Sequence, residues 1–176
     1  MKALLILALG CSVVTATFSY AAEKSAANRK ATVTYEAPEK FTDFTNSGFG
    51  SASDKDLKYL TDVFTAHIEK LANRLLAADE HLEITFKDID LAGRFEPEHG
   101  PSRQNIRIYR DITSPRMHLV FRLLGPDGQV RTEGERQLTD MNYSMNLLPP
   151  MGDSEYRYDF ALLTDWMNAE FQKKKT

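Results

Sequence analysis

Two aspartates that lie two residues apart suggest the chemistry that this sequence could perform. Asp88 and Asp90 end an alternating, strand-like segment, and Arg94 and Glu96 follow them. Residues two apart on a strand share a face, so these carboxylates could bind a cation or act as an acid and base pair. Together with Glu96 and Asp140, the two aspartates would form the centre of a small carboxylate-based or metal-dependent hydrolase. The interpretation that we favour is structural: the acids pair with Arg94 and accept hydrogen bonds from nearby loop amides.

Short catalytic signatures give the enzyme hypothesis little support. The sequence has no His-Glu-x-x-His, no Gly-x-Ser-x-Gly and no phosphate-binding glycine loop. The acids miss the spacing of a calcium loop, and the four histidines fall on different predicted elements without ligand spacing. We therefore expect no metal and no cofactor, although a site built only from carboxylates would leave no short motif.

A second group of residues is suited to anions. In the predicted strand from residue 106, Arg107 and Tyr109 face away from the apolar positions, and Arg122 follows on the next strand. Guanidinium groups in a planar array beside a tyrosine would suit the phosphate or carboxylate groups of an envelope polymer or lipid. The alternative, which we favour, is a solvated face on which arginines pair with Glu133 and Glu135 across strands.

A methionine-rich loop is the third candidate surface. Residues 139–153 include Met141, Met145 and Met151, and Tyr143 joins the candidate ligand-binding residues in this loop. Methionine adapts to irregular partners, so the loop could contact another protein. Such a segment more often folds over an open edge of the core.

Alternation and helical spacing predict the elements that position these residues. We expect strands at 31–36, 82–91, 106–112, 116–124 and 129–138, and helices at 53–75 and 154–171. Ser53 and Asp56 predict a capping box, and a phase slip near Lys87 and Asp88 predicts a bulge.

The order of these elements predicts an α+β fold. The order β-α-β-β-β-β-α favours a two-layer sandwich, with a mostly antiparallel sheet of about five strands and two helices on one face. The segment 125–128, Gly-Pro-Asp-Gly, predicts a tight hairpin turn, and the strand at 116–124 is apolar on both faces, which places it centrally.

The N-terminus has the pattern of a cleavable export signal. Lys2 precedes an apolar run, and a small-residue cleavage site ends near Ala21. We expect 1–21 to be removed, 22–30 to be a polar linker and 31–176 to form one soluble domain in the periplasm, without a transmembrane anchor. Cys11, the only cysteine, would leave with the signal; we do not expect it to be lipidated, because its apolar stretch is too short.

Charge excludes one class of partner. The chain has 22 basic and 25 acidic residues, a formal charge of −3. Nucleic-acid-binding domains usually show a basic excess, so we expect no nucleic acid partner.

Five stretches of the sequence resemble a bacterial exported family known as domain of unknown function 3016. They are 38–43 (PEKFTD), 88–97 (DIDLAGRFEP), 107–112 (RIYRDI), 138–143 (LTDMNY) and 162–166 (LLTDW). The resemblance implies a bacterial envelope setting and supplies no catalytic residues. We expect a periplasmic binding or accessory module that engages an anionic envelope component or an envelope protein, with the hydrolase as the alternative.

Overall fold

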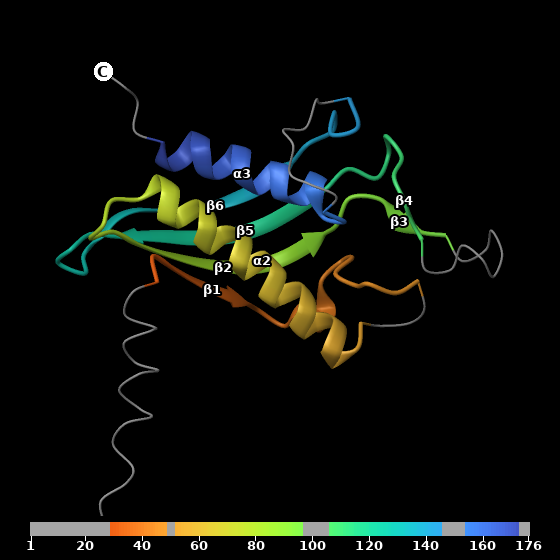
Figure 1. The fold of residues 1–176 in the computed structure, drawn as a ribbon, viewed down its shortest axis with the longest axis horizontal. Coiled ribbons are helices and arrows are strands. Elements are labelled where there is room, and N and C mark those ends of the chain that lie inside the picture. The colour runs from red at the N-terminus through yellow and green to blue at the C-terminus, as the bar shows by residue number, and fades with distance from the viewer. Residues whose placement is uncertain (1–28, 49–51, 97–105, 146–153, 173–176) are drawn as a thin grey trace, which may run out of the picture.

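The computed structural model describes residues 29–48, 52–96, 106–145 and 154–172, and the expected export signal and most of the linker lie outside them. These described residues form six strands, two α-helices and a short 3-10 helix, and Figure 1 shows their arrangement. In chain order these are β1 (Ala31–Tyr35), η1 (Pro38–Lys40), α2 (Asp54–Leu75), β2 (His81–Asp90), β3 (Arg94–Phe95), β4 (Arg107–Ile108), β5 (Arg116–Leu124), β6 (Val130–Thr139) and α3 (Arg157–Phe171).

The main sheet is mixed and has four strands in the order β1-β2-β5-β6. Strand β1 runs parallel to β2, while β2, β5 and β6 pair antiparallel. Parallel neighbours need a crossover connection, which α2 supplies between β1 and β2. The α+β class is confirmed, and β5 lies centrally as predicted. The expected sheet of about five strands, in the predicted order, is wrong.

The error lies at the predicted strand 106–112. Only Arg107 and Ile108 form a strand there, and they pair with β3 in a separate two-stranded sheet. A turn follows at once, because the Thr113 amide and hydroxyl both donate to the Arg110 carbonyl oxygen, each at 2.8 Å. The apolar alternation at Ile106 and Ile108 is therefore too short to extend the main sheet.

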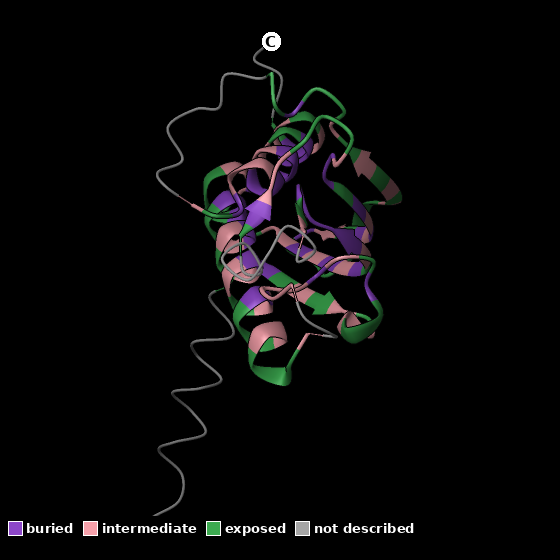
Figure 2. Ribbon diagram, turned by 90° about the vertical axis from the view of Figure 1, so that its right-hand side faces the viewer, coloured by how far each residue is buried: buried purple, intermediate pink, exposed green. Residues whose placement is uncertain are grey.

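Helices α2 and α3 cover one face of the main sheet, which we call the covered face (Figures 1 and 2). The core lies between these layers and is rich in aromatic rings: Phe64 of α2 contacts the rings of Phe44 and Phe160 at 5.6 and 5.2 Å. From β5, Phe121 meets Trp166 of α3 at 5.7 Å. Within the described residues, no helix is long and apolar enough to cross a membrane.

Local sequence signals place the elements well. Ser53 and Asp56 form the predicted capping box at the start of α2. The register between β2 and β5 shifts between Phe86 and Asp88, which is the predicted bulge. The shift returns Ile89 to the covered face and sends Asp88 and Asp90 to the other side of the sheet. No described helix or strand lies over that side, which we call the open face (Figure 2).

Candidate functional site

The open face carries four rows of side chains across β2, β5 and β6. From β2 to β6 the rows are Asp90, Arg116 and Thr139; Asp88, His118 and Gln137; Thr85, Val120 and Glu135; and Glu83, Arg122 and Glu133. Directly opposed side chains on one face of an antiparallel pair interact. The strand register therefore assembles a mostly polar surface from residues distant in sequence.

In the row that contains Arg122, the positive charge is neutralised by neighbouring carboxylates. The guanidinium lies 3.2 Å from Glu83 and 3.7 Å from Glu133, so two acids flank one base. The His118 ring is hydrogen-bonded to the Glu135 carboxylate. An arginine, Arg122, does pair with Glu133 as predicted, but the side-chain partner of the Glu135 carboxylate is His118. This part of the face offers no excess cation to an anion.

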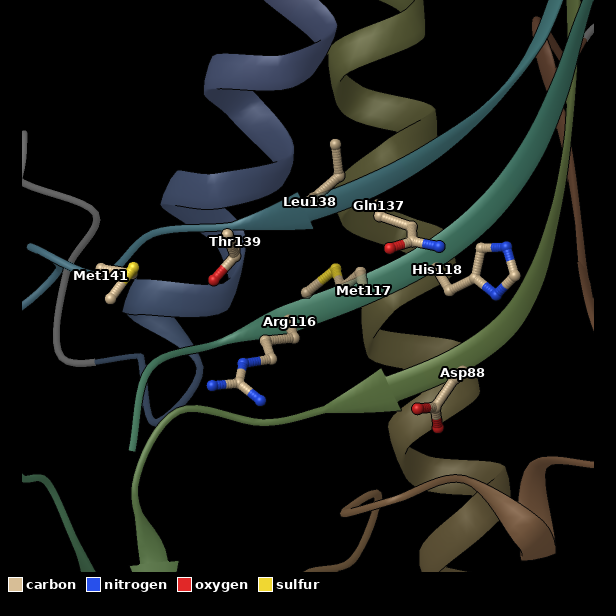
Figure 3. A pocket seen from close by; sticks show the side chains of 8 residues that line it. All are labelled: Asp88, Arg116, Met117, His118, Gln137, Leu138, Thr139 and Met141. Atoms are coloured by element: carbon tan, nitrogen blue, oxygen red, sulfur yellow. The ribbon is translucent and has the colours of Figure 1, made fainter. Parts of the chain in front are cut away.

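The other end of the open face is hollowed. A concavity of about 540 Å³, which we call the sheet hollow, lies where β2 ends and β6 leaves the sheet (Figure 3). Its lining residues are Asp88, Arg116, Met117, His118, Gln137, Leu138, Thr139 and Met141. Arg116 is exposed, and no carboxylate of the described residues lies within 4.0 Å of its guanidinium. Ligand sites of this kind combine apolar walls with a few polar groups.

The alternation predicts that Arg107 lies on an exposed sheet face, and this prediction is wrong. Arg107 lies inside the molecule. Its side chain is 3% exposed and forms a bidentate pair with Asp43, at 2.8 and 3.1 Å. It also donates to the carbonyl oxygens of Gly93 and Thr45, and it lies over the Phe95 ring. A bidentate arginine pair with further carbonyl partners is a structural clamp for these loops.

Asp159 lies beside this clamp in the first turn of α3 and is almost wholly buried. Its Oδ1 accepts a hydrogen bond from the Ala92 amide at 3.0 Å. Burial raises the pKa of Asp159 to about 7, although the Ala92 hydrogen bond and the charge of Arg107 lower it. We call Asp43, Arg107 and Asp159 the loop anchor, since they tie four segments together.

Two of the predicted ligand-binding tyrosines also have structural contacts. The Tyr109 hydroxyl donates to the Glu155 carbonyl oxygen at 2.8 Å, and that of Tyr143 donates to the Arg110 carbonyl oxygen at 2.7 Å. Both rings meet Tyr158 edge-on, at 5.1 and 4.8 Å. Tyr143 is 1% exposed, so it fastens the loop after β6 and does not present a surface.

Two of the predicted acids have the contacts that we favoured. Both carboxylate oxygens of Asp88 are held by Thr42, through its amide and its hydroxyl, each at 2.7 Å. Asp90 lies 3.3 Å from Arg94. Burial raises the pKa of Asp90, and Arg94 partly offsets this effect.

The other two acids lie elsewhere. Glu96 pairs with Arg110 at 2.7 Å, and not with Arg94. Asp140 accepts the Asn142 amide at 2.9 Å in its own turn. The structure therefore does not gather Asp88, Asp90, Glu96 and Asp140 at one point. Among the described residues, no group of three or more histidine, cysteine, aspartate or glutamate side chains could hold a metal ion.

Sequence reasoning missed most of the sheet hollow. Arg116, His118, Gln137 and Thr139 alternate on two strands that the sequence predicted correctly, and the 125–128 turn joins those strands. Extending the register outward from that turn would have placed the four side chains together. Asp43 has no comparable signal, because it lies in an irregular segment.

Comparison with known proteins agrees with this sequence pattern. A family model described as "Protein of unknown function (DUF3016)" matches residues 29–169. The chain belongs to this family. All five resembling stretches lie within the matched region, as do the sheet hollow and the loop anchor. No curated protein and no solved structure matches the chain significantly.

Proposed function

We propose that this DUF3016 protein is a periplasmic binding or accessory module, which holds an envelope component against its open face. The observation that carries the proposal is the sheet hollow. It lies on a sheet face that no described helix or strand covers, and Arg116 brings to it a cation with no described ion-pair partner. The exported setting rests on the signal pattern at 1–21.

The contacts of the acids favour binding over hydrolysis. The two carboxylates of an acid–base pair must both face the substrate, on either side of the bond that is cleaved. Here Asp88 is fixed to Thr42, Asp90 to Arg94 and Glu96 to Arg110. These contacts direct the carboxylates to separate loops. The hydrolase hypothesis therefore has no geometric support beyond the sequence spacing that suggested it.

Co-sedimentation tests the proposal. The mature chain, residues 22–176, is incubated with isolated bacterial envelope fractions, and the bound fraction is measured for wild type and Gln137→Trp. Gln137 is exposed and lines the sheet hollow, so the indole fills the hollow without disturbing the core. We expect retention to fall to the background level.

Asn73→Trp is the matched control, because it replaces an exposed amide by the same ring on α2, on the other side of the molecule. It should sediment like wild type. Equal retention of wild type and Gln137→Trp would remove the open face from the proposed function.

A further inference from the structure

A second, smaller hollow lies beside the sheet hollow and shares Arg116 with it. This loop hollow has a volume of about 50 Å³. Its lining includes Asp90, Arg94, Ile112, Ser114 and Arg116. A water molecule occupies about 30 Å³ of liquid, so the space has the scale of one small polar group and not of a whole organic ligand.

The charge around the loop hollow is positive. Arg94 and Arg116 both line it, and Asp90 is the only acid among the lining residues. Asp90 accepts a single hydrogen bond from Arg94, at 3.3 Å. Among the lining residues, two guanidinium groups and one carboxylate leave an excess of one positive charge. Both arginines are exposed, so most of their N–H donors are available to a ligand.

Ser114 is the third polar group and is independent of the arginines. It is 7% exposed, lines the loop hollow, and its hydroxyl makes no hydrogen bond to any described residue. Among the described residues, the buried side-chain atoms without a hydrogen-bond partner are Arg107 Nε and Trp166 Nε1, so the Ser114 oxygen is not sealed in the core and reaches the space of the loop hollow. The hydroxyl can therefore donate a hydrogen bond to a group that occupies the hollow.

We infer that Arg94, Arg116 and Ser114 bind a phosphate group, whose remaining substituent extends into the sheet hollow. Guanidinium groups suit phosphate because their N–H donors match its oxygens in pairs, and a serine hydroxyl adds one further donor. Because Arg116 lines both hollows, it places the phosphate at their junction. The inference rests on the proposed function, since it names the ligand class of the same face.

Exposed apolar side chains favour a lipid headgroup as the source of the phosphate. Ile112 is 84% exposed on the rim of the loop hollow, and Met141 is 73% exposed on that of the sheet hollow. Their two loops are joined by a hydrogen bond from Ser144 to Asp111, at 2.6 Å. Apolar side chains around an anion site suit the boundary between lipid headgroups and acyl chains.

Calorimetry with free ligands is the first arm of the test. Inorganic phosphate and glycerol phosphate are titrated into the mature chain at fixed ionic strength, in a buffer without phosphate. Arg116→Gln should weaken binding by about tenfold or more, as expected for a lost hydrogen bond to a charged group. Ser114→Ala should weaken it less. Arg122→Gln is the matched control and should bind like wild type, because Glu83 and Glu133 already neutralise Arg122.

Vesicle flotation is the second arm and separates the two sources of phosphate. Vesicles of phosphatidylglycerol in phosphatidylcholine are compared with phosphatidylcholine alone. A lipid ligand predicts binding that Arg116→Gln and Ile112→Ser both reduce; a soluble phosphate ester predicts binding in the first arm alone. Either result supports the phosphate site.

Absence of binding in both arms, or binding that Arg116→Gln leaves unchanged, overturns the inference. The proposed function has its own readout, because Gln137→Trp would still release the protein from envelope fractions if the ligand were not a phosphate.

Discussion

Arg107 and Arg116 are close in sequence, but their guanidinium groups have opposite surroundings. Arg107 lies in the loop anchor, where Asp43 and several carbonyl oxygens surround it. Arg116 lies at the junction of two hollows, exposed and without a described ion-pair partner. Residue type alone predicts the same anion-binding role for both. Their surroundings differ: Arg107 stabilises the fold, and Arg116 is available to a ligand.

The comparison extends to the regions around the two arginines. In the loop anchor, charge is removed from water and must be compensated by close partners. On the open face, charge stays hydrated, and its pairs contribute little to stability. We therefore expect substitutions in the loop anchor to lower stability strongly, and substitutions on the open face to change stability little.

The largest effect is expected for Arg107→Met. This change leaves the Asp43 carboxylate, whose side chain is 10% exposed, without its partner. Breaking a buried pair by removing one member typically costs about 3–5 kcal/mol. The free energy of unfolding from urea denaturation should fall by this amount.

The double variant Arg107→Met/Asp43→Asn separates charge from packing. It removes the stranded carboxylate, so it should recover part of the loss. A single variant as stable as wild type would show that the loop anchor is not a folding element, and the contrast with Arg116 would fail.

The second effect is a pH dependence that arises at Asp159. The pKa of this group is raised from 3.8 to about 7 in the folded state. Between these values the folded state binds more protons than the unfolded state, so stability falls as pH rises. Between pH 5 and pH 8 the contribution of Asp159 should decrease by roughly 2 to 3 kcal/mol.

Asp159→Asn keeps an oxygen for the Ala92 amide and removes the titration. The variant should lack this decline, and the difference between its urea-unfolding free energy and that of wild type should grow in its favour from pH 5 to pH 8. A constant difference would contradict the raised pKa. The charges of Arg107 and Asp43 also act on the pKa of this carboxyl, so both residues must remain unchanged in the experiment.

The sequence predicts the regular elements of this fold and misses how one of them pairs. Apolar alternation and helical spacing predict β1, α2, β2, β5 and α3, because each of these elements buries one face or stripe, whereas none of the residues of β6 is buried and the turn at 125–128 marks that strand. The segment at 106–112 has the same alternation over too few residues, and the Thr113 turn ends it. The parallel pairing of β1 is a tertiary property that local pattern does not encode.

The candidate site was less predictable for a related reason. Asp88 and Asp90 were found because they are close in sequence, although their partners, Thr42 and Arg94, limit their chemistry. Arg116 and Ser114 have ordinary local sequence, and they become notable only once their burial and pairing are known. The side chains of Arg107 and Arg116 differ in burial, and the spacing of residues in the sequence does not predict this difference.

A smaller pH effect of opposite sign is expected at His67. Its ring stacks on Phe160 at 4.2 Å, and burial lowers its pKa from 6.5 to about 4. Between these values the unfolded state binds more protons, so this contribution to stability falls as pH decreases below about 6.5. Lys70, Arg74 and Thr164 are its polar neighbours.

His67→Gln removes this titration and keeps a side chain that can pair with Thr164. The variant should lose less stability than wild type between pH 6.5 and pH 4.5, measured by urea unfolding. Parallel pH profiles would contradict the lowered pKa.

The smallest effect is expected for Arg122→Gln, and it tests the open face most directly. Arg122 has two acidic partners, yet its side chain is half exposed and both acids are at least 40% exposed. Exposed ion pairs contribute about 0–1 kcal/mol, and salt screens them further. The loss should lie in this range at low salt and become smaller in 1 M sodium chloride.

A double-mutant cycle with Glu133→Gln isolates the interaction energy of the pair itself. A loss as large as that of Arg107→Met would mean that hydration does not distinguish the two regions, because charge pairing would then stabilise the open face as strongly as the loop anchor.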